Sequence, residues 1–218
     1  MPSKVSSRGR TTARTTPAPA RTAARQQPIP DHSKAVRGEG DRSPFPHLWQ
    51  HAAAFAARQH KHQIRKDGAT PYFSHVVRVA FTVSQVFGCT DDAVLCMALL
   101  HDTIEDTTTD YDDIESRFGE DIAKGVAALT KNMALPEEER EAEYDARIAK
   151  ADWRVRLVKL ADTYDNLCDV VTQSPDRVKE KRKDAIKKCK RAIDLASKDV
   201  KANPHTAGAI AALATLIR

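Results

Sequence analysis

Hydrophobic residues recur at helical spacing along most of the chain, and no stretch alternates as a half-buried strand would. The first helix is predicted at about 46–61, and the second begins near Pro71 and ends at Gly88. Asp91 is placed to cap a third helix, whose positions 93–100 (AVLCMALL) are apolar on every side. A helix without a polar face needs neighbours all round, so we expect the third helix to be central and buried.

The rest of the chain continues the same helical pattern. Further helices are predicted at about 110–118, 119–131, 137–151, 153–172, 176–200 and 204–217. We therefore predict an all-α fold, a bundle of about eight to ten helices. A chain of 218 residues is long enough for one sizeable core, so we expect one site in one core.

The start of the chain differs from the rest in composition. Residues 1–42 contain nine Lys or Arg residues and three acidic ones, a charge of +6, whereas the whole chain carries +5. The basic charge thus belongs to this segment and does not indicate that the folded part binds nucleic acid. Because no apolar periodicity precedes Pro44, we expect residues 1–43 to be a disordered tail and residues 44–218 to form one domain. An organellar targeting peptide is the alternative to a solubilising tail.

No feature of the sequence predicts export, membrane insertion or a disulfide framework. The four cysteines show no CxxC spacing, and each lies in or directly beside a predicted helix: Cys89, Cys96, Cys168 and Cys189. There is no run of 18 apolar residues, and the N-terminus lacks the apolar segment of a secretory signal. We expect a cytoplasmic protein with reduced thiols, while the oligomeric state stays open.

The stretch LLHDTIEDT at 99–107 carries the main chemical signal, because four charged or imidazole side chains follow directly on the apolar helix: His101, Asp102, Glu105 and Asp106. Burying unpaired charges there would be costly. Residues four apart share a helix face, so His101 is expected beside Glu105, and Asp102 beside Asp106. A divalent cation would stabilise carboxylates clustered beside an imidazole, since it supplies the missing positive charge. The alternative is a solvated helix end, which the preceding apolar octet disfavours.

One helix cannot surround an ion, so further ligands are expected from other segments. His75 lies in PYFSHVVRVA, where apolar positions indicate a helix packed on the core. Asp162 ends the apolar run VRLVKLAD. Both would then converge with His101 and Asp102 on one point. Mixed imidazole and carboxylate ligation suits Mn²⁺, Fe²⁺ or Zn²⁺ better than Ca²⁺, which prefers oxygen alone.

Three blocks of the sequence, in this order, resemble a known family. HKHQIRKDGATPYFSHVVRVA, LLHDTIEDT and VKLADTYDNL are similar to the HD-type hydrolase domain of the RelA/SpoT family, whose members degrade the alarmone (p)ppGpp; the match covers about Trp49 to Asn166. The large members also carry synthetase and regulatory domains, for which 218 residues leave no room, so the resemblance implies a stand-alone small alarmone hydrolase. The family often has a basic residue after the Asp of its LAD block, whereas Thr163 and Tyr164 follow Asp162 here. This departure concerns substrate preference rather than the metal site.

The resemblance implies roles for individual residues. Four of them would bind Mn²⁺: His75, His101, Asp102 and Asp162. Glu105 and Asp106 would orient and deprotonate the attacking water, with Glu105 the expected base. Arg65 and Lys66 would meet substrate phosphates, and Asn166 would contact the nucleotide.

The implied reaction removes pyrophosphate from the 3′ position of ppGpp or pppGpp and leaves GDP or GTP, with water activated by the cation. Two alternatives stay open: an HD phosphatase acting on another nucleotide, such as a deoxynucleoside monophosphate or NADPH, and a non-catalytic alarmone-binding sensor. A nucleic-acid-binding module would rest only on the tail and on the basic helix at 176–191, which we interpret as a solvated outer face rather than a phosphate entrance. The predicted partner is thus a small nucleotide, without a membrane or nucleic acid.

Overall fold

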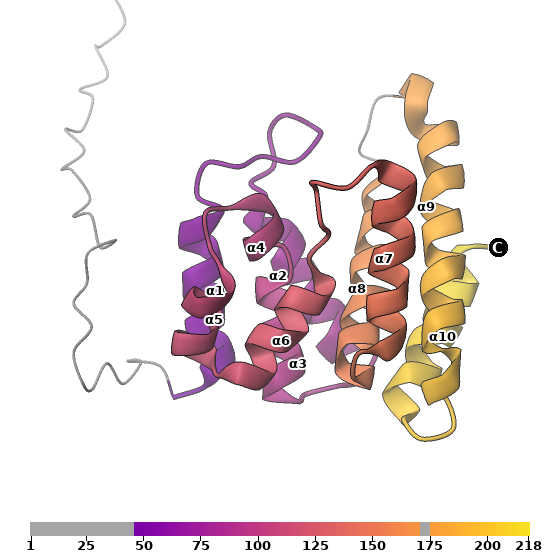
Figure 1. Cartoon of the computed structure of the whole chain (residues 1–218). Coiled ribbons are helices and arrows are strands. Elements are labelled where there is room, and N and C mark those ends of the chain that lie inside the picture. Colours follow the sequence, from indigo (N-terminus) through magenta and orange to yellow (C-terminus); the bar gives the residue numbers. More distant parts are fainter. Residues whose placement is uncertain (1–45, 171–174) are drawn as a thin grey trace, which may run out of the picture. The chain divides into compact units, whose positions relative to one another are not determined.

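The computed structural model describes residues 46–170 and 175–218, which fold into a helical bundle (Figure 1). Its α-helices are α1 (Leu48–Gln59), α2 (Phe73–Phe81), α3 (Asp92–Leu100), α4 (Thr103–Asp106), α5 (Tyr111–Phe118), α6 (Glu120–Leu129), α7 (Glu137–Lys150), α8 (Trp153–Asp169), α9 (Pro175–Ala196) and α10 (Pro204–Leu216). A π-helical turn, η2 (Thr82–Val86), continues α2, and a 3-10 turn, η4 (Ser197–Asp199), continues α9. Within these residues no strand forms beyond one isolated bridge between Ile64 and Pro71. The all-α prediction is confirmed.

Helix α3 lies at the centre of the bundle, as its uniformly apolar sequence predicts. Six of its nine residues are buried: Val94, Cys96, Met97, Ala98, Leu99 and Leu100. Helices α1, α2, α6 and α8 pack around it. The predicted cap is also confirmed, because Asp91 Oδ1 accepts hydrogen bonds from the backbone N–H groups of Ala93 and Val94 at 2.9 and 3.1 Å. The C-terminal end of α3 is therefore held firmly inside the protein.

Helix α8 connects this core to the C-terminal part of the bundle, since it packs against α2 and α3 and also against α9 and α10. Near its start, Arg156 is buried and forms a bidentate ion pair with Asp199, at 2.5 and 2.9 Å. The same guanidinium donates to the carbonyl oxygens of Ile148 and Ala151 at the end of α7. This single side chain thus ties the α7–α8 turn to η4 and fixes where α8 lies.

The structure differs from the sequence-based expectations at several boundaries. The expectation that residues 101–106 continue the third helix is wrong, because α3 ends at Leu100 and a turn at His101 and Asp102 precedes the one-turn helix α4. Helix α8 ends at Asp169, and residues 171 and 172 of the predicted helix lie outside the described residues, as does the predicted tail at 1–43. None of the described helices is long and apolar enough to cross a membrane.

Candidate metal centre and active site

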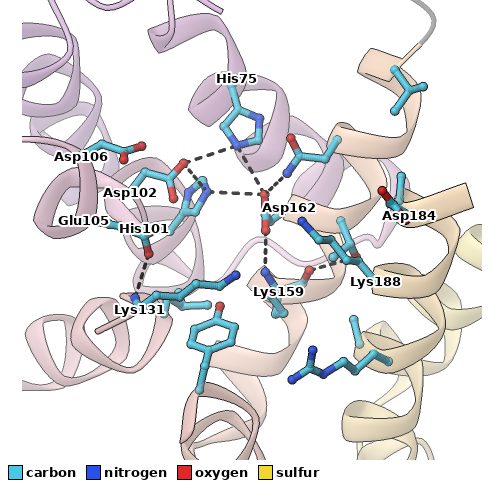
Figure 2. A pocket seen from close by; sticks show the side chains of 18 of the residues that line it. His75, His101, Asp102, Glu105, Asp106, Lys131, Lys159, Asp162, Asp184 and Lys188 are labelled. Carbon is cyan, nitrogen blue, oxygen red and sulfur yellow. Dashed lines mark hydrogen bonds and ion pairs between the residues drawn. The ribbon is translucent and has the colours of Figure 1, made fainter. Parts of the chain in front are cut away.

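Four of the predicted residues meet where α2, the α3–α4 turn and α8 converge (Figure 2). His75 Nε2, on α2, lies 3.4 Å from Asp162 Oδ1, on α8, and 3.6 Å from Asp102 Oδ2. His101 Nε2 lies 3.1 Å from Asp102 Oδ2 and 3.8 Å from Asp162 Oδ1. Both imidazoles are almost fully buried. The structure therefore brings together the two histidines and two aspartates that the sequence singled out.

The donor atoms of this cluster suit a divalent cation. His75, His101 and Asp162 each offer one ligand atom, and these atoms all lie within 4.8 Å of one another. His101 Nδ1 lies 2.8 Å from the carbonyl oxygen of Ala98, and because a carbonyl can only accept, Nδ1 must carry the hydrogen. In the neutral imidazole Nε2 then has the free lone pair, and this buried atom has no hydrogen-bond partner among the described residues. The lone pair of this nitrogen faces carboxylate oxygens, and no hydrogen-bond donor of the described residues lies between them. Such an arrangement of electron-donating atoms suits a bound cation.

The charge on each group of the cluster depends on its neighbours. Burial opposes protonation of His75, but Asp102, Asp162 and Asp165 outweigh it and raise the pKa of this imidazole well above its usual value. Burial likewise opposes ionisation of Asp162, yet Lys159 and the two imidazoles hold the pKa of this carboxyl well below its usual range. The Lys159 ammonium donates to Asp162 Oδ2 at 2.9 Å. The ionised carboxylates of the cluster thus favour a positive charge beside them, which a proton or a bound cation can supply.

Glu105 and Asp106 lie on α4 beside the same cluster (Figure 2). Glu105 is partly buried, and its Oε2 accepts a hydrogen bond from the backbone N–H of Lys131 at 2.8 Å. Loss of water contact raises the pKa of Glu105 against the opposing effect of that N–H. Desolvation, followed by the charge of Asp102, also raises the pKa of Asp106. A carboxylate with a raised pKa is a better proton acceptor, and the backbone N–H of Lys131 holds Glu105 in a fixed orientation.

A cavity of about 880 Å³ opens beside the cluster and extends to α9. Seven cationic side chains line it: Arg65, Lys66, Lys131, Lys159, Lys181, Lys188 and Arg191. The pKa of Lys66 is lowered by partial burial and then by the charges of Lys181 and Lys188, which shows that these three ammonium groups lie within electrostatic range of one another. Within the described part of the chain, none of the three forms an ion pair with a carboxylate. Lys181 and Lys188 of the basic helix thus line the cavity, which the interpretation of this helix as an outer face did not include.

The predicted substrate residues Arg65, Lys66 and Asn166 all line this cavity. Arg65 is already engaged, because its Nη2 donates to Asp169 Oδ2 at 2.8 Å and to Asn166 Oδ1 at 3.1 Å. Its guanidinium also lies over the Tyr72 ring, with Cζ 5.4 Å from the ring centroid. The ammonium of Lys66 is the less committed of the two cations.

Comparison with known proteins agrees with this geometry. A family model described as "HD domain" matches residues 52–189, more than half of the chain. The chain belongs to the HD domain family. This HD domain is 43% identical over 132 residues to the protein named guanosine-3′,5′-bis(diphosphate) 3′-pyrophosphohydrolase MESH1 of Xenopus tropicalis, and 41% identical to the Homo sapiens protein of the same name; both matches cover 60% of this chain and 74% of the relative.

A solved structure supports the same relationship for the HD domain. It is described as "A metazoan ortholog of SpoT hydrolyzes ppGpp and plays a role in starvation responses", and it superposes with a TM-score of 0.68 at 32% identity. The superposition covers 78% of this chain and 94% of the other. The resemblance drawn from three short sequence blocks is thereby confirmed.

Sequence reasoning missed several polar side chains that hold the site of this HD domain in place. Asp165 lies 2.7 Å from His75 Nδ1, and the Tyr72 hydroxyl donates to Asp102 at 2.6 Å. The available signal was the spacing along α8, where polar residues at 162, 165, 166 and 169 share one face of a helix that is otherwise largely buried. Of these four, only Asp162 and Asn166 were predicted as site residues from the sequence.

Proposed function

We propose that this HD domain removes the 3′-pyrophosphate of ppGpp or pppGpp and leaves GDP or GTP. The observation that carries the proposal is the buried histidine and aspartate cluster, which opens directly into a cavity to which seven cationic side chains also contribute. Such a combination suits a phosphate ester attacked by water. The relatives support the choice of substrate, because they are named for hydrolysis of guanosine-3′,5′-bis(diphosphate) at the 3′ position.

We further propose that the divalent ion is Mn²⁺ and that four side chains hold it: His75, His101, Asp102 and Asp162. When bound, such a cation lowers the pKa of water and polarises the phosphoryl group under attack. The unpartnered Nε2 of His101 and the crowding of carboxylates beside it are the features that support a cation there.

Glu105 would accept the proton of the attacking water. The Lys131 N–H holds its Oε2, which leaves Oε1 to take the proton, and its raised pKa makes it a stronger base than an ordinary carboxylate. Asp106, one position further along α4, would help to orient the water. This route needs no covalent intermediate.

The substrate carries two groups of phosphates, so its charge must be balanced at both ends of the cavity. Lys159 is already paired with Asp162 next to the cluster. Lys66, Lys181 and Lys188 have no carboxylate partner in the described structure, so we propose that they bind the phosphates that are not cleaved. We assign Arg65 and Asn166 to the nucleoside, because Arg65 is held by Asp169 with its flat guanidinium at the cavity wall.

The deciding experiment is incubation of the full-length, Mn²⁺-loaded protein with ppGpp, followed by identification of the products. We expect GDP and pyrophosphate. Release of orthophosphate from a deoxynucleoside monophosphate or from NADPH, with ppGpp left intact, would favour a phosphatase acting on another nucleotide. Binding of ppGpp without any cleavage would favour an alarmone sensor. We also propose a cytoplasmic location, which suits the four free cysteines.

A further inference from the structure

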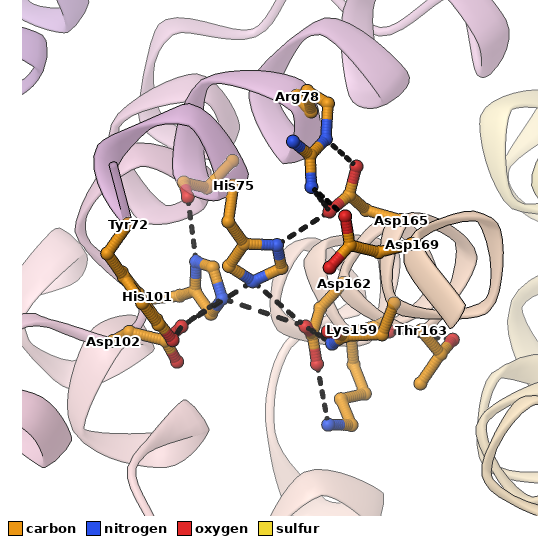
Figure 3. A network of polar contacts seen from close by, with 12 residues as sticks. Tyr72, His75, Arg78, His101, Asp102, Lys159, Asp162, Thr163, Asp165 and Asp169 are labelled. Atoms are coloured by element: carbon orange, nitrogen blue, oxygen red, sulfur yellow. Dashed lines mark hydrogen bonds and ion pairs between the residues drawn. The ribbon is translucent and has the colours of Figure 1, made fainter. Parts of the chain in front are cut away.

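A series of hydrogen bonds leaves the proposed metal cluster at His75 and returns to it at Asp162. Figure 3 shows its first part, from His75 through Asp165 and Arg78 to Asp169. The whole series passes through five side chains: Asp165, Arg78, Asp169, Arg65 and Asn166. The sequence-based prediction of the site contains only the last two. The other three have no assigned role in binding or catalysis, although Asp165 is among the most buried carboxylates of the described structure.

The first contacts of this series fix the orientation of His75. Its Nδ1 lies 2.7 Å from Asp165 Oδ2, in a place where the Asp165 side chain is only 5% exposed and the imidazole 1%. Arg78 holds Asp165 with two hydrogen bonds, from Nε to Oδ1 at 2.6 Å and from Nη2 to Oδ2 at 2.9 Å. The bidentate pair compensates the cost of burying the carboxylate and prevents its rotation.

The remaining contacts connect this pair to the cavity wall. Arg78 Nη2 also donates to Asp169 Oδ1 at 3.1 Å, and Asp169 Oδ2 accepts from Arg65 Nη2 at 2.8 Å. Asn166 then closes the series, because its Oδ1 accepts from Arg65 and its Nδ2 donates to Asp162 Oδ1 at 2.5 Å. Residues from two helices and one loop are thereby held in a single arrangement around the cluster.

We propose that Asp165 is a positioning residue of the metal centre. It accepts the Nδ1–H of His75 and so turns Nε2, with its lone pair, toward the place of the cation, while Arg78 holds Asp165 in position. The inference rests on the proposed function, because it assumes a cation beside His75. It goes further by naming the residues outside the ligand set that determine how tightly the cation is bound.

The two histidines would then be oriented by different means. The Nδ1–H of His101 donates to the main-chain carbonyl oxygen of Ala98, which is neutral. The Nδ1–H of His75 meets an ionised carboxylate, which makes the opposite nitrogen a stronger electron donor. Hydrogen-bond partners of this kind decide which nitrogen of a ligand histidine faces the metal. His75 is therefore the ligand whose strength a single substitution outside the cluster can change.

The test compares three variants of the full-length protein: Asp165→Ala, Asp165→Asn and Asp199→Asn. The last is a matched control, because Asp199 also forms a bidentate pair with a buried arginine, Arg156, whereas only Asp165 contacts a proposed metal ligand. For each variant we would measure the Mn²⁺ dissociation constant by competition with a chelator, the melting temperature, and kcat at saturating Mn²⁺. The first of these readouts does not depend on activity.

We expect Asp165→Ala to weaken Mn²⁺ binding by roughly 10- to 100-fold. Asp165→Asn should lose less, since its amide oxygen can still accept the Nδ1–H, and saturating Mn²⁺ should restore most of kcat in both variants. Asp199→Asn should lower the melting temperature and leave the dissociation constant unchanged. The proposal is wrong if Asp165→Ala binds Mn²⁺ within about twofold of the unaltered protein, or if Asp199→Asn weakens binding equally.

The outcome for the unaltered protein separates this inference from the proposed function. If that protein binds Mn²⁺ but does not cleave ppGpp, the substrate assignment fails, and the dissociation constants of the variants still decide the role of Asp165. If it binds no Mn²⁺, the metal centre and the inference about Asp165 both fail.

Discussion

The two sides of the cavity hold their charges in different ways. On the side formed by α2, the α3–α4 turn and α8, the charged groups are buried or half-buried and each is held by a partner, as Asp162 is by Lys159. On the α9 side, Arg191 is paired with Glu141 and Asp145, but Lys181 and Lys188 have no carboxylate partner in the described structure. A buried charge needs a fixed partner, whereas an accessible lysine can remain hydrated until an anion arrives. We infer that the first side performs the chemistry and that the second recognises the charge of the substrate.

The largest effects should come from the buried side. We expect His101→Ala or Asp102→Ala to reduce turnover of ppGpp by at least roughly 10³-fold, because each removes a proposed ligand and leaves the remaining charges of the cluster uncompensated. The bound Mn²⁺ of the purified variants, measured by elemental analysis, should fall together with turnover. Near-normal rates in both variants would show that the cluster is not the catalytic centre.

Glu105→Gln should separate chemistry from metal binding. The amide can still accept the hydrogen bond from the Lys131 N–H, so the local structure should persist, but it cannot take a proton from water. We expect kcat to fall by roughly 10²- to 10⁴-fold, with the Mn²⁺ content and KM close to those of the unaltered protein. Loss of the metal together with activity would instead place Glu105 among the ligands.

The fold was predictable from the sequence where one pattern dominated. The apolar octet at 93–100 indicated a central helix, and Asp91 marked its start. The turn at His101 and Asp102 was not visible, because the residues after it still favour a helix. Side chains make this turn: the Thr103 hydroxyl donates back to the carbonyl oxygen of Leu100 at 2.7 Å. A break of this kind depends on local hydrogen bonds that periodicity does not record.

The candidate site was predictable where a polar residue stands in an apolar context. His101 and Asp162 fit that description, since each follows a run of buried residues. Asp165 and Arg78 do not, because a charged residue on an amphipathic helix reads as a surface position until its partner is known. The same holds for Lys188. Helical spacing shows which residues share a face, but not which part of the protein that face meets.

The α9 side should affect binding rather than chemistry. We expect the double variant Lys181→Ala, Lys188→Ala to raise KM for ppGpp by roughly tenfold, with kcat unchanged. This factor corresponds to a loss of about 0.5 to 1 kcal/mol of binding free energy for each lysine charge removed. The increase should shrink at high salt, which screens exposed charges. Lys187→Ala is the matched control, because this lysine is exposed on the same helix but does not line the cavity. An equal increase in KM for the control would mean that only the net charge of α9 matters.

The smallest effect we predict is a decrease in KM, opposite to the increase expected for the lysine variants. Glu141 on α7 pairs with both Lys131 and Arg191, so its carboxylate neutralises two cations that line the cavity. Glu141→Gln removes a negative charge that faces the polyanionic substrate, and Arg191 keeps Asp145 as its partner. We therefore expect KM for ppGpp to fall by roughly two- to threefold at low salt, with kcat unchanged. A higher KM would show that Glu141 serves mainly to hold Lys131 and Arg191 in position, and the α9 side would then need fixed partners as much as the buried side does.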